Sequence, residues 1–303
     1  MAMTLAGTIA AVLTPLDDNL QPDLGEHLAH CQRLLEQGCD GLSPLGTSGE
    51  SMSFSIAERK AILEALLKGS LSPDILLPGT GAASYADTIE LTRHALSVGV
   101  TSVLMLPPFY YKAVNDDGLF DAFSRIVDGV GDERLRICLY HIPPVAVVPI
   151  SHRLVGRLRA AYPGIFVGVK DSSGDFTNMT GYIDQFPGFA VLSGGEAMIK
   201  PILEYGGAGS ITGCANLVAP DIALVTRHFR DPARAAEVDA AHHRLARARM
   251  AITSKPNISV MKAILAQQTG QATWRQVRPP LSPLDDAAVQ PIVDALAALG
   301  THA

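Results

Sequence analysis

Short apolar runs alternate with amphipathic stretches from the N-terminus to residue 230. Apolar runs bounded by turn residues are typical of strands that are buried on both faces, as in parallel sheets. These runs predict strands at 7–14, 41–45, 75–79, 102–106, 136–141, 166–170, 190–193 and 210–212. The amphipathic stretches between them predict helices at 23–37, 55–68, 85–98, 117–129, 151–159, 177–185, 197–205 and 219–229.

This succession of strand–helix units predicts the fold class. No charge run or low-complexity linker separates the units, so an α/β fold is expected, and a closed (β/α)8 TIM barrel is favoured over an open doubly wound sheet. From Asp231 the alternation stops, and three helices are predicted at 232–251, 258–267 and 285–299. The sequence therefore predicts a barrel over residues 1–230 and a C-terminal helical extension over residues 231–303 that packs on it.

Composition excludes several classes of function. With 48% hydrophobic and 18% charged residues, the chain has the balance of a globular protein rather than a disordered one. A net charge of −6 provides no basic field for nucleic acid or an acidic membrane, so an anionic ligand would need local donors. No apolar run reaches the length of a membrane span, and the N-terminus lacks the pattern of a secretory signal.

The cysteine pattern adds to this picture. Cys31, Cys39, Cys138 and Cys214 are scattered and form no CxxC pair, so neither a zinc site nor a disulfide framework is indicated. We expect buried, reduced thiols, no metal site and a cytoplasmic protein.

One lysine ends an apolar strand. The segment IFVGVKDSSG at 165–174 carries a β-branched run that delivers Lys170 into a polar turn. An amine there would be partly desolvated, which favours the neutral, nucleophilic form. The carboxyl ends of barrel strands are also where barrel enzymes carry their sites. Lys170 is therefore a candidate nucleophile, and the alternative is a lysine that ends the strand and points to water.

A glycine-bracketed turn follows the second predicted strand. In LGTSGE, Gly46 and Gly49 flank Thr47 and Ser48, so backbone N–H groups and two hydroxyls can approach a ligand. The turn would suit a carboxylate in a protein without basic excess. An ordinary strand-to-helix turn is the alternative.

Tyrosines end two further strands. Tyr110 lies in LPPFYYK at 106–112, and Tyr140 lies in CLYHIPP at 138–144. A tyrosine beside a lysine and a carboxylate-binding turn can relay protons. Aromatic packing with the hydroxyl in water is the alternative role.

Taken together, the motifs carry a resemblance to a known family. These motifs occur in order along nearly the whole chain: GTSGE at 46–50, PPFYY at 107–111, LYHIP at 139–143, GVKDSSGD at 168–175, LSGGEA at 192–197, GGAGSITGCAN at 206–216 and RPPL at 278–281. With this set, the chain resembles the dihydrodipicolinate synthase and N-acetylneuraminate lyase superfamily of Schiff-base-forming, pyruvate-type aldolases.

This resemblance implies a homotetramer of eight-stranded barrels that needs neither a metal nor an organic cofactor. Lys170 would form an imine with the ketone of a 2-oxo acid, and Tyr140 would transfer protons. The turn from Gly46 through Thr47 and Ser48 would hold the carboxylate.

Four further positions take roles only through the resemblance. Tyr110 matches a tyrosine that reaches into a neighbouring subunit's site and completes a relay with Thr47. Ile211 would line the pyruvate pocket. Gly194 and Glu196 lie in the SGGEA segment, where an acid binds substrate hydroxyls in the lyase and sugar-acid aldolase branches. An acid that interacts with a helix dipole is the alternative for Glu196.

The loop after the fifth predicted strand departs from the family pattern. Synthase members carry an arginine there that binds the carboxylate of aspartate semialdehyde, and this chain has Val145 at that place and Val147 where a glycine stands. Valine cannot replace the bidentate grip of a guanidinium. Residues 144–148 instead form an apolar loop, which could accommodate an uncharged or aromatic acceptor.

These observations predict a Schiff-base-forming lyase that cleaves or forms a carbon–carbon bond of a 2-oxo acid. Pyruvate would be the donor or product, and an aldehyde would be the second substrate or product. A dehydratase of a keto-deoxy sugar acid that uses the same imine is the close alternative, and 4-hydroxy-tetrahydrodipicolinate synthase activity is disfavoured by Val145. The non-enzymatic alternative is a regulatory barrel that binds a keto acid.

Overall fold

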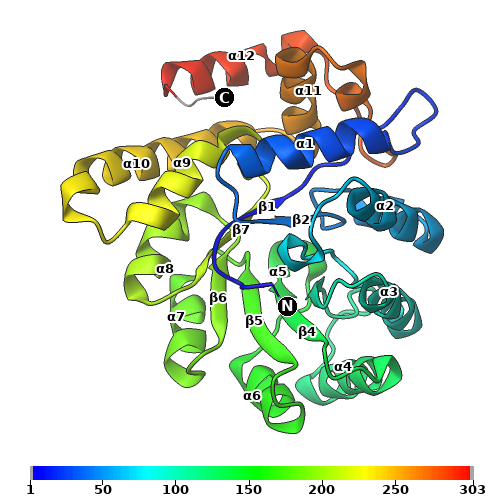
Figure 1. Ribbon diagram of the computed structural model, residues 1–303. Coiled ribbons are helices and arrows are strands. Elements are labelled where there is room, and N and C mark those ends of the chain that lie inside the picture. The colour runs from blue at the N-terminus through cyan, green and yellow to red at the C-terminus, as the bar shows by residue number, and fades with distance from the viewer. Residues whose placement is uncertain (1–2, 301–303) are drawn as a thin grey trace.

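The computed structural model describes residues 3–300. Parallel strands form one sheet that curves into a barrel, with helices around it (Figure 1). Neighbouring strands follow the order β2-β1-β7-β6-β5-β4-β3. Their bounds are β1 Gly7–Ala11, β2 Gly41–Ser43, β3 Ser102–Met105, β4 Arg136–His141, β5 Phe166–Asp171, β6 Ala190–Ser193 and β7 Gly209–Thr212.

The strand predicted at 75–79 is wrong as a regular strand. Only isolated parallel bridges flank this segment, Leu42 with Leu76 on the β2 side and Gly79 with Leu104 on the β3 side. Pro78 is one reason why no regular strand forms here, because proline has no main-chain N–H to donate to a neighbouring strand. The segment still lies between β2 and β3 and hydrogen-bonds to both. The Leu77 N–H donates to the Leu42 carbonyl at 2.8 Å, and the Leu104 N–H donates to the Pro78 carbonyl at 2.9 Å. The barrel predicted from the sequence is confirmed, with this extended segment in the eighth position.

The predicted helices of the barrel occur in the predicted order, and a short helix that was not predicted, α5, forms in the apolar loop after β4. α1 begins after Asp23, and Ser55 forms a capping box with Glu58 at the start of α2. α9 begins four residues before its predicted start, because two helical pieces meet at a kink at Val218. The bounds are α1 Leu24–Glu36, α2 Ile56–Lys68, α3 Tyr85–Ser97, α4 Asp116–Val130, α5 Pro143–Ala146, α6 His152–Ala161, α7 Phe176–Gln185, α8 Ile199–Tyr205 and α9 Ala215–His228.

The C-terminal part of the chain is helical, with α10 Ala235–Ile252, α11 Asn257–Thr269 and α12 Asp286–Ala298. α10 lies beside α9, and α11 and α12 contact each other at one end of the molecule (Figure 1). No described helix has the length and apolar character needed to cross a membrane. The division into two domains at residue 230 stays a prediction.

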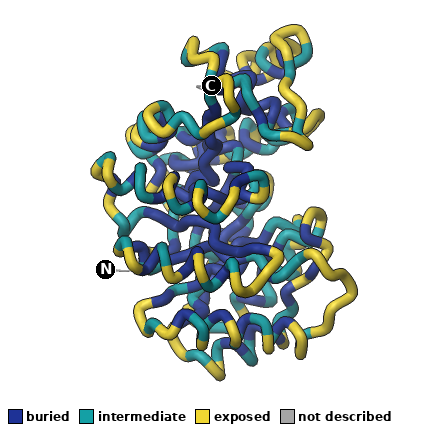
Figure 2. Tube along the Cα trace, turned by 90° about the vertical axis from the view of Figure 1, so that its right-hand side faces the viewer, coloured by how far each residue is buried: buried dark blue, intermediate teal, exposed yellow. Residues whose placement is uncertain are grey.

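Buried residues form two clusters. A large cluster fills the space between the sheet and the helices, and a smaller one fills the barrel interior. Figure 2 shows the strands as largely buried, while exposed residues gather on the outer turns of the helices and on loops. The interior cluster includes Ile9, Leu104, Tyr140, Leu192 and Ile211.

A bulge interrupts the pairing of β4 with β5. Ile137 is paired with Phe166, whereas the next residue, Cys138, is paired with Gly168. Val167 is therefore the extra residue of the bulge. Because strand side chains alternate between faces, an extra residue reverses which face every later side chain occupies.

The bulge determines where Lys170 points. Phe166 packs in the outer core, and strict alternation without an extra residue would send Lys170 to the same outer side. With the extra residue, Lys170 is paired with Tyr140, whose side chain belongs to the barrel interior. The lysine therefore faces the interior.

Candidate active site

Lys170 and Tyr140 meet on neighbouring strands at the carboxyl end of the barrel. Lys170 is 5% exposed, and its Nζ lies 4.2 Å from the centroid of the Tyr140 ring. Cys138, two residues before Tyr140, is also in the interior, and burial raises the pKa of its thiol to about 12. Because the Lys170 side chain is buried beside Tyr140, the alternative of a lysine that points to water is excluded.

The turn after β2 brings a hydroxyl to this pair. Thr47 Oγ1 donates a hydrogen bond to the Tyr140 hydroxyl at 3.4 Å. The turn is closed by the Glu50 N–H, which donates to the Thr47 carbonyl, and by the Ser51 N–H, which donates to the Gly46 carbonyl. The structure thus brings Lys170, Tyr140 and Thr47 together from three strand ends.

Close approaches hold the same turn against the barrel. A Cβ on Gly49 would lie 2.8 Å from the Val12 carbonyl oxygen, so this position requires glycine. A Cβ on Gly213, just after β7, would lie 2.7 Å from Ser48 Oγ. Ser48 therefore lies next to the end of β7. Ile211 of that strand is fully buried in the interior cluster that contains Tyr140.

Comparison with known proteins decides the family. The profile of the dihydrodipicolinate synthetase family matches residues 4–299. This chain belongs to that family. An uncharacterized DapA-like lyase of Chloroflexus aurantiacus is 34% identical to it over 286 residues, which cover 93% of each protein. A 4-hydroxy-tetrahydrodipicolinate synthase of Agrobacterium fabrum is 32% identical over 293 residues, covering 95% of this chain and 96% of the relative.

Solved structures agree with this assignment. Dihydrodipicolinate synthase from Agrobacterium tumefaciens superposes with a TM-score of 0.89 at 32% identity, over 97% of this chain and 99% of that one. A prophage protein of the family from E. coli K12, solved in complex with pyruvate, superposes with a TM-score of 0.90 at 26% identity, over 98% and 99% of the two chains. The family and enzyme class predicted from the motifs are confirmed, and this dihydrodipicolinate synthetase family member is a Schiff-base-forming lyase of the pyruvate type.

In this family member, a buried acid, Glu196, begins the short 3₁₀ helix that follows β6. Glu196 is 0% exposed, and no described residue donates a hydrogen bond to either carboxylate oxygen. Its nearest cation is Arg249 of α10, whose Nη1 lies 3.5 Å from Oε2. Burial and then the Glu196 carboxylate raise the pKa of the Cys214 thiol well above its usual range. Sequence reasoning found Glu196 but missed Arg249, which comes from a distant helix.

Gly194 precedes this acid and lies against β5. Its N–H donates to the Asp171 carbonyl at 2.7 Å, and a Cβ on Gly194 would lie 1.9 Å from Ser172 Oγ. The Asp171 carboxylate, immediately after Lys170, accepts bonds from Ser173 and from Asn178. Asp171 therefore holds the turn that follows the lysine, a role that the sequence reasoning did not identify.

Tyr110 stands apart from the other candidates within the chain. It is 71% exposed, and its ring packs edge-on against Tyr111 with centroids 5.2 Å apart. The expected relay with Thr47 depends on a neighbouring subunit and stays a prediction. Val145, in α5, is 62% exposed at the mouth of the barrel.

Glu50, the last residue of the GTSGE motif, links the turn to the C-terminal helices. Its backbone is left-handed with φ of 57°, and its Oε1 accepts a bond from Lys262 Nζ of α11 at 2.6 Å. Its Oε2 accepts a hydrogen bond from the main-chain N–H of Arg278 at 2.8 Å. Burial lowers the pKa of Lys262, and the Glu50 carboxylate opposes this effect. Neither Glu50 nor Lys262 was singled out from the sequence, because their contact joins residues far apart in the chain.

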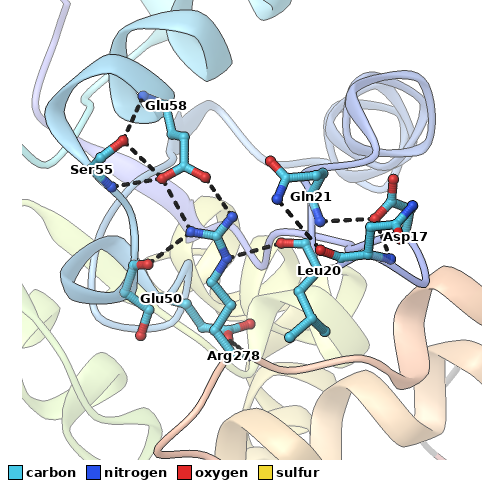
Figure 3. Close-up of polar contacts among 9 residues, drawn as sticks. Asp17, Leu20, Gln21, Glu50, Ser55, Glu58 and Arg278 are labelled. Carbon is cyan, nitrogen blue, oxygen red and sulfur yellow. Dashed lines mark hydrogen bonds and ion pairs between the residues drawn. The ribbon is translucent and has the colours of Figure 1, made fainter.

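Arg278 fixes the same region from the C-terminal side. Its guanidinium lies between Glu58 and the Leu20 carbonyl (Figure 3). The bonds to the two Glu58 carboxylate oxygens measure 2.5 and 3.1 Å, and the Ser53 carbonyl accepts a further bond. The pKa of Glu58 falls to about 2, chiefly because of the Arg278 hydrogen bond. The RPPL segment therefore clamps the turn after β2 to the start of α2.

Within residues 3–300, no group of three or more His, Cys, Asp or Glu side chains is placed to hold a metal ion. The four cysteines are buried and free, as predicted.

Proposed function

We propose that Lys170 is the imine-forming nucleophile of a lyase that cleaves a 4-hydroxy-2-oxo acid to pyruvate and an aldehyde. The observation that supports this most directly is the buried Lys170 Nζ beside the Tyr140 ring, at 4.2 Å from its centroid. Barrel enzymes place catalytic groups at this end of the strands.

The proposed reaction begins with addition of the amine to the ketone carbon. The carbonyl oxygen takes up protons by way of Tyr140 and leaves as water, which produces a cationic imine on Lys170. The imine then accepts the electron pair of the breaking carbon–carbon bond. The 4-hydroxyl gives up its proton and becomes the aldehyde oxygen, and the remaining enamine is protonated and hydrolysed to pyruvate and free Lys170. The bond from Thr47 to the Tyr140 hydroxyl provides a relay for these protons.

The turn that carries Thr47 and Ser48 is the proposed carboxylate site, with Gly46 allowing close approach of the backbone. Ser48 lies next to Gly213, just after β7, the strand that carries the proposed pocket residue Ile211. β1 alone separates β7 from β2, the strand before the turn. Holding the carboxylate would orient the imine so that one face meets Tyr140, an advantage of positioning.

Several finer parts of the proposal rest on the resemblance. We propose a cytoplasmic homotetramer in which Tyr110 reaches a neighbouring site. Its high exposure supports this, as does the exposure of two apolar side chains in the same segment, Tyr111 and Val114. The buried reduced cysteines support a reducing compartment. Glu196 and Gly194 are proposed to face the distal part of the substrate.

The relatives named 4-hydroxy-tetrahydrodipicolinate synthase favour that activity as a second candidate. Val145 stands where synthases have the arginine that grips aspartate semialdehyde, so we place cleavage of another 2-oxo acid first. A dehydratase that uses the same lysine shares every step up to the cationic imine, and it then loses a proton from C3 instead of breaking the carbon–carbon bond.

Borohydride trapping tests the proposal. Reduction in the presence of pyruvate is expected to add one pyruvate-derived group to the peptide that carries Lys170, as measured by mass spectrometry. Lys170→Ala should remove the adduct. Lys112→Ala, at an exposed lysine whose ammonium bonds to main-chain carbonyls, is the matched control and should keep it. Absence of an adduct on the wild-type protein would refute the imine mechanism.

A further inference from the structure

A cavity of about 400 Å³ opens beside the proposed imine site. It lies between the turn after β2, the loop after β3, α5 and residues 280–281. Thr47 lines this cavity and donates to the Tyr140 hydroxyl, and a narrow adjoining cavity is lined by both residues. The cavity therefore shares a wall with the place where the aldehyde carbon must react, and its volume lies in the range of small-molecule sites.

The walls of this cavity are mostly apolar. Leu106 and Phe109 form one side, Val145 and Ile142 a second, and Leu281 a third. Apolar walls with few polar groups are typical of pockets that bind an apolar part of a ligand.

Two polar groups on the walls, the Glu50 carboxylate and the Ser53 carbonyl, already have protein partners. Both Glu50 carboxylate oxygens are hydrogen-bonded, one to Lys262 and the other to the Arg278 N–H. The Ser53 carbonyl accepts from the Arg278 guanidinium. The residues that line the cavity include no lysine, arginine or histidine.

Besides Lys262, the cations Lys112 and Arg278 lie close to the walls, and protein groups hold both of them. Lys112 donates to the carbonyls of Phe109 and Ala146. The Arg278 guanidinium is paired with Glu58. A carboxylate placed in the cavity would therefore meet no free cation among the described lining residues and would lie close to Glu50.

We infer that this cavity receives the side chain of an uncharged, apolar aldehyde, aliphatic or aromatic, as the second substrate. The inference rests on the proposed function. In the condensation direction, C3 of the enamine on Lys170 bonds to the aldehyde carbon, and the aldehyde oxygen takes a proton through Tyr140. Water then hydrolyses the imine, releasing the 4-hydroxy-2-oxo acid and restoring the amine. Cleavage runs through the same steps in reverse.

A homologous series of aldehydes tests the inference. Pyruvate is condensed with propanal, butanal, pentanal and hexanal, and with aspartate semialdehyde, and the products are followed by mass spectrometry. Specificity, kcat/KM for the aldehyde, should rise about three- to fourfold for each methylene that enters the cavity. The kcat/KM for aspartate semialdehyde should be about a hundredfold or more below that for hexanal, because the carboxylate of the semialdehyde would be buried without a partner.

A second experiment places a positive charge in the cavity wall. Val145→Arg should lower kcat/KM for hexanal at least about tenfold and raise it for aspartate semialdehyde, since the guanidinium adds a cation and removes apolar wall. Val147→Arg is the matched control, because Val147 lies two residues away in the same exposed loop and does not line the cavity. It should leave the order of the substrates unchanged.

Failure of the inference and failure of the proposed function give different results. If borohydride traps pyruvate on Lys170 but the aldehyde series is flat, or aspartate semialdehyde is preferred, the apolar subsite is refuted and the imine mechanism stands. If no adduct forms, the proposed function fails, and the inference fails with it.

Discussion

Lys262 and Glu50 form an ion pair of 2.6 Å whose two side chains are both fully buried. Glu50 lies two residues after Ser48, in the turn proposed to hold the substrate carboxylate, while Lys262 lies on α11. The main-chain N–H of Arg278 donates a hydrogen bond to the second oxygen of the Glu50 carboxylate. The C-terminal helices are thus connected to the turn by charge as well as by packing.

Lys262→Met should destabilise the protein and impair pyruvate binding. Removing the ammonium leaves a buried carboxylate with only part of its partners, which typically costs about 3–5 kcal/mol. The turn is expected to shift, so KM for pyruvate should rise more than kcat falls. Urea unfolding and steady-state kinetics measure the two effects.

Two further variants control that experiment. Adding Glu50→Gln to Lys262→Met removes the uncompensated charge and should recover part of the lost stability. Lys68→Met removes an exposed lysine whose Glu64 partner lies 3.6 Å away, and it should change stability by less than about 1 kcal/mol. Equal losses in both lysine variants would mean that the buried pair has no special role.

Tyr140→Phe should lower kcat by about 10²- to 10⁴-fold, because the phenol is the proposed proton donor and acceptor. The fold should be retained, since the hydroxyl has a single long bond, with Thr47. Tyr162→Phe removes a hydroxyl that donates to Asp128 at the surface, and it should keep full activity. Full activity of Tyr140→Phe would exclude this tyrosine from proton transfer.

Gly49→Ala should destabilise the protein more than Gly46→Ala does, although both glycines lie in the same turn. A Cβ on Gly49 would lie 2.8 Å from the Val12 carbonyl oxygen, whereas a Cβ on Gly46 would have no atom within 4 Å. Gly49→Ala should therefore lose about 1–3 kcal/mol of stability, and Gly46→Ala should lose little. Thermal unfolding compares them, and equal melting temperatures would contradict the close approach.

His27 should make stability depend on pH. Burial, followed by repulsion from His30 and Lys262, lowers the pKa of His27 to about 3, so the folded protein keeps this ring neutral. The unfolded chain takes up a proton near the ordinary value of 6.5, so stability is lost as the pH falls from 6.5 toward 3. The expected slope approaches about 1.4 kcal/mol per pH unit for this group.

His27→Leu removes that contribution. Urea unfolding between pH 8 and pH 5 should give the variant a shallower loss of stability than the wild type below about pH 6, and parallel behaviour above pH 7. Parallel curves over the whole range would show that His27 does not stay neutral in the folded protein.

Much of the fold and the main residues of the candidate site followed from local sequence patterns. The alternation of apolar runs and amphipathic stretches predicted the order of strands and helices. A strand that is buried on both faces is apolar at successive positions, whereas a helix that is buried on one face is apolar only at every third or fourth position. Motifs at strand ends determined the candidates Lys170, Tyr140 and Thr47, since parallel strands bring their carboxyl ends to one side of the barrel.

Contacts between distant residues were decided only by the tertiary structure. The extra residue Val167 turns Lys170 into the barrel, and this shift is visible only against the neighbouring strand β4. The pairing of Glu50 with Lys262 and the approach of Arg249 to Glu196 join segments that no local period connects. Local patterns specify which face of an element is buried, but only the packed chain specifies which polar groups share the buried space.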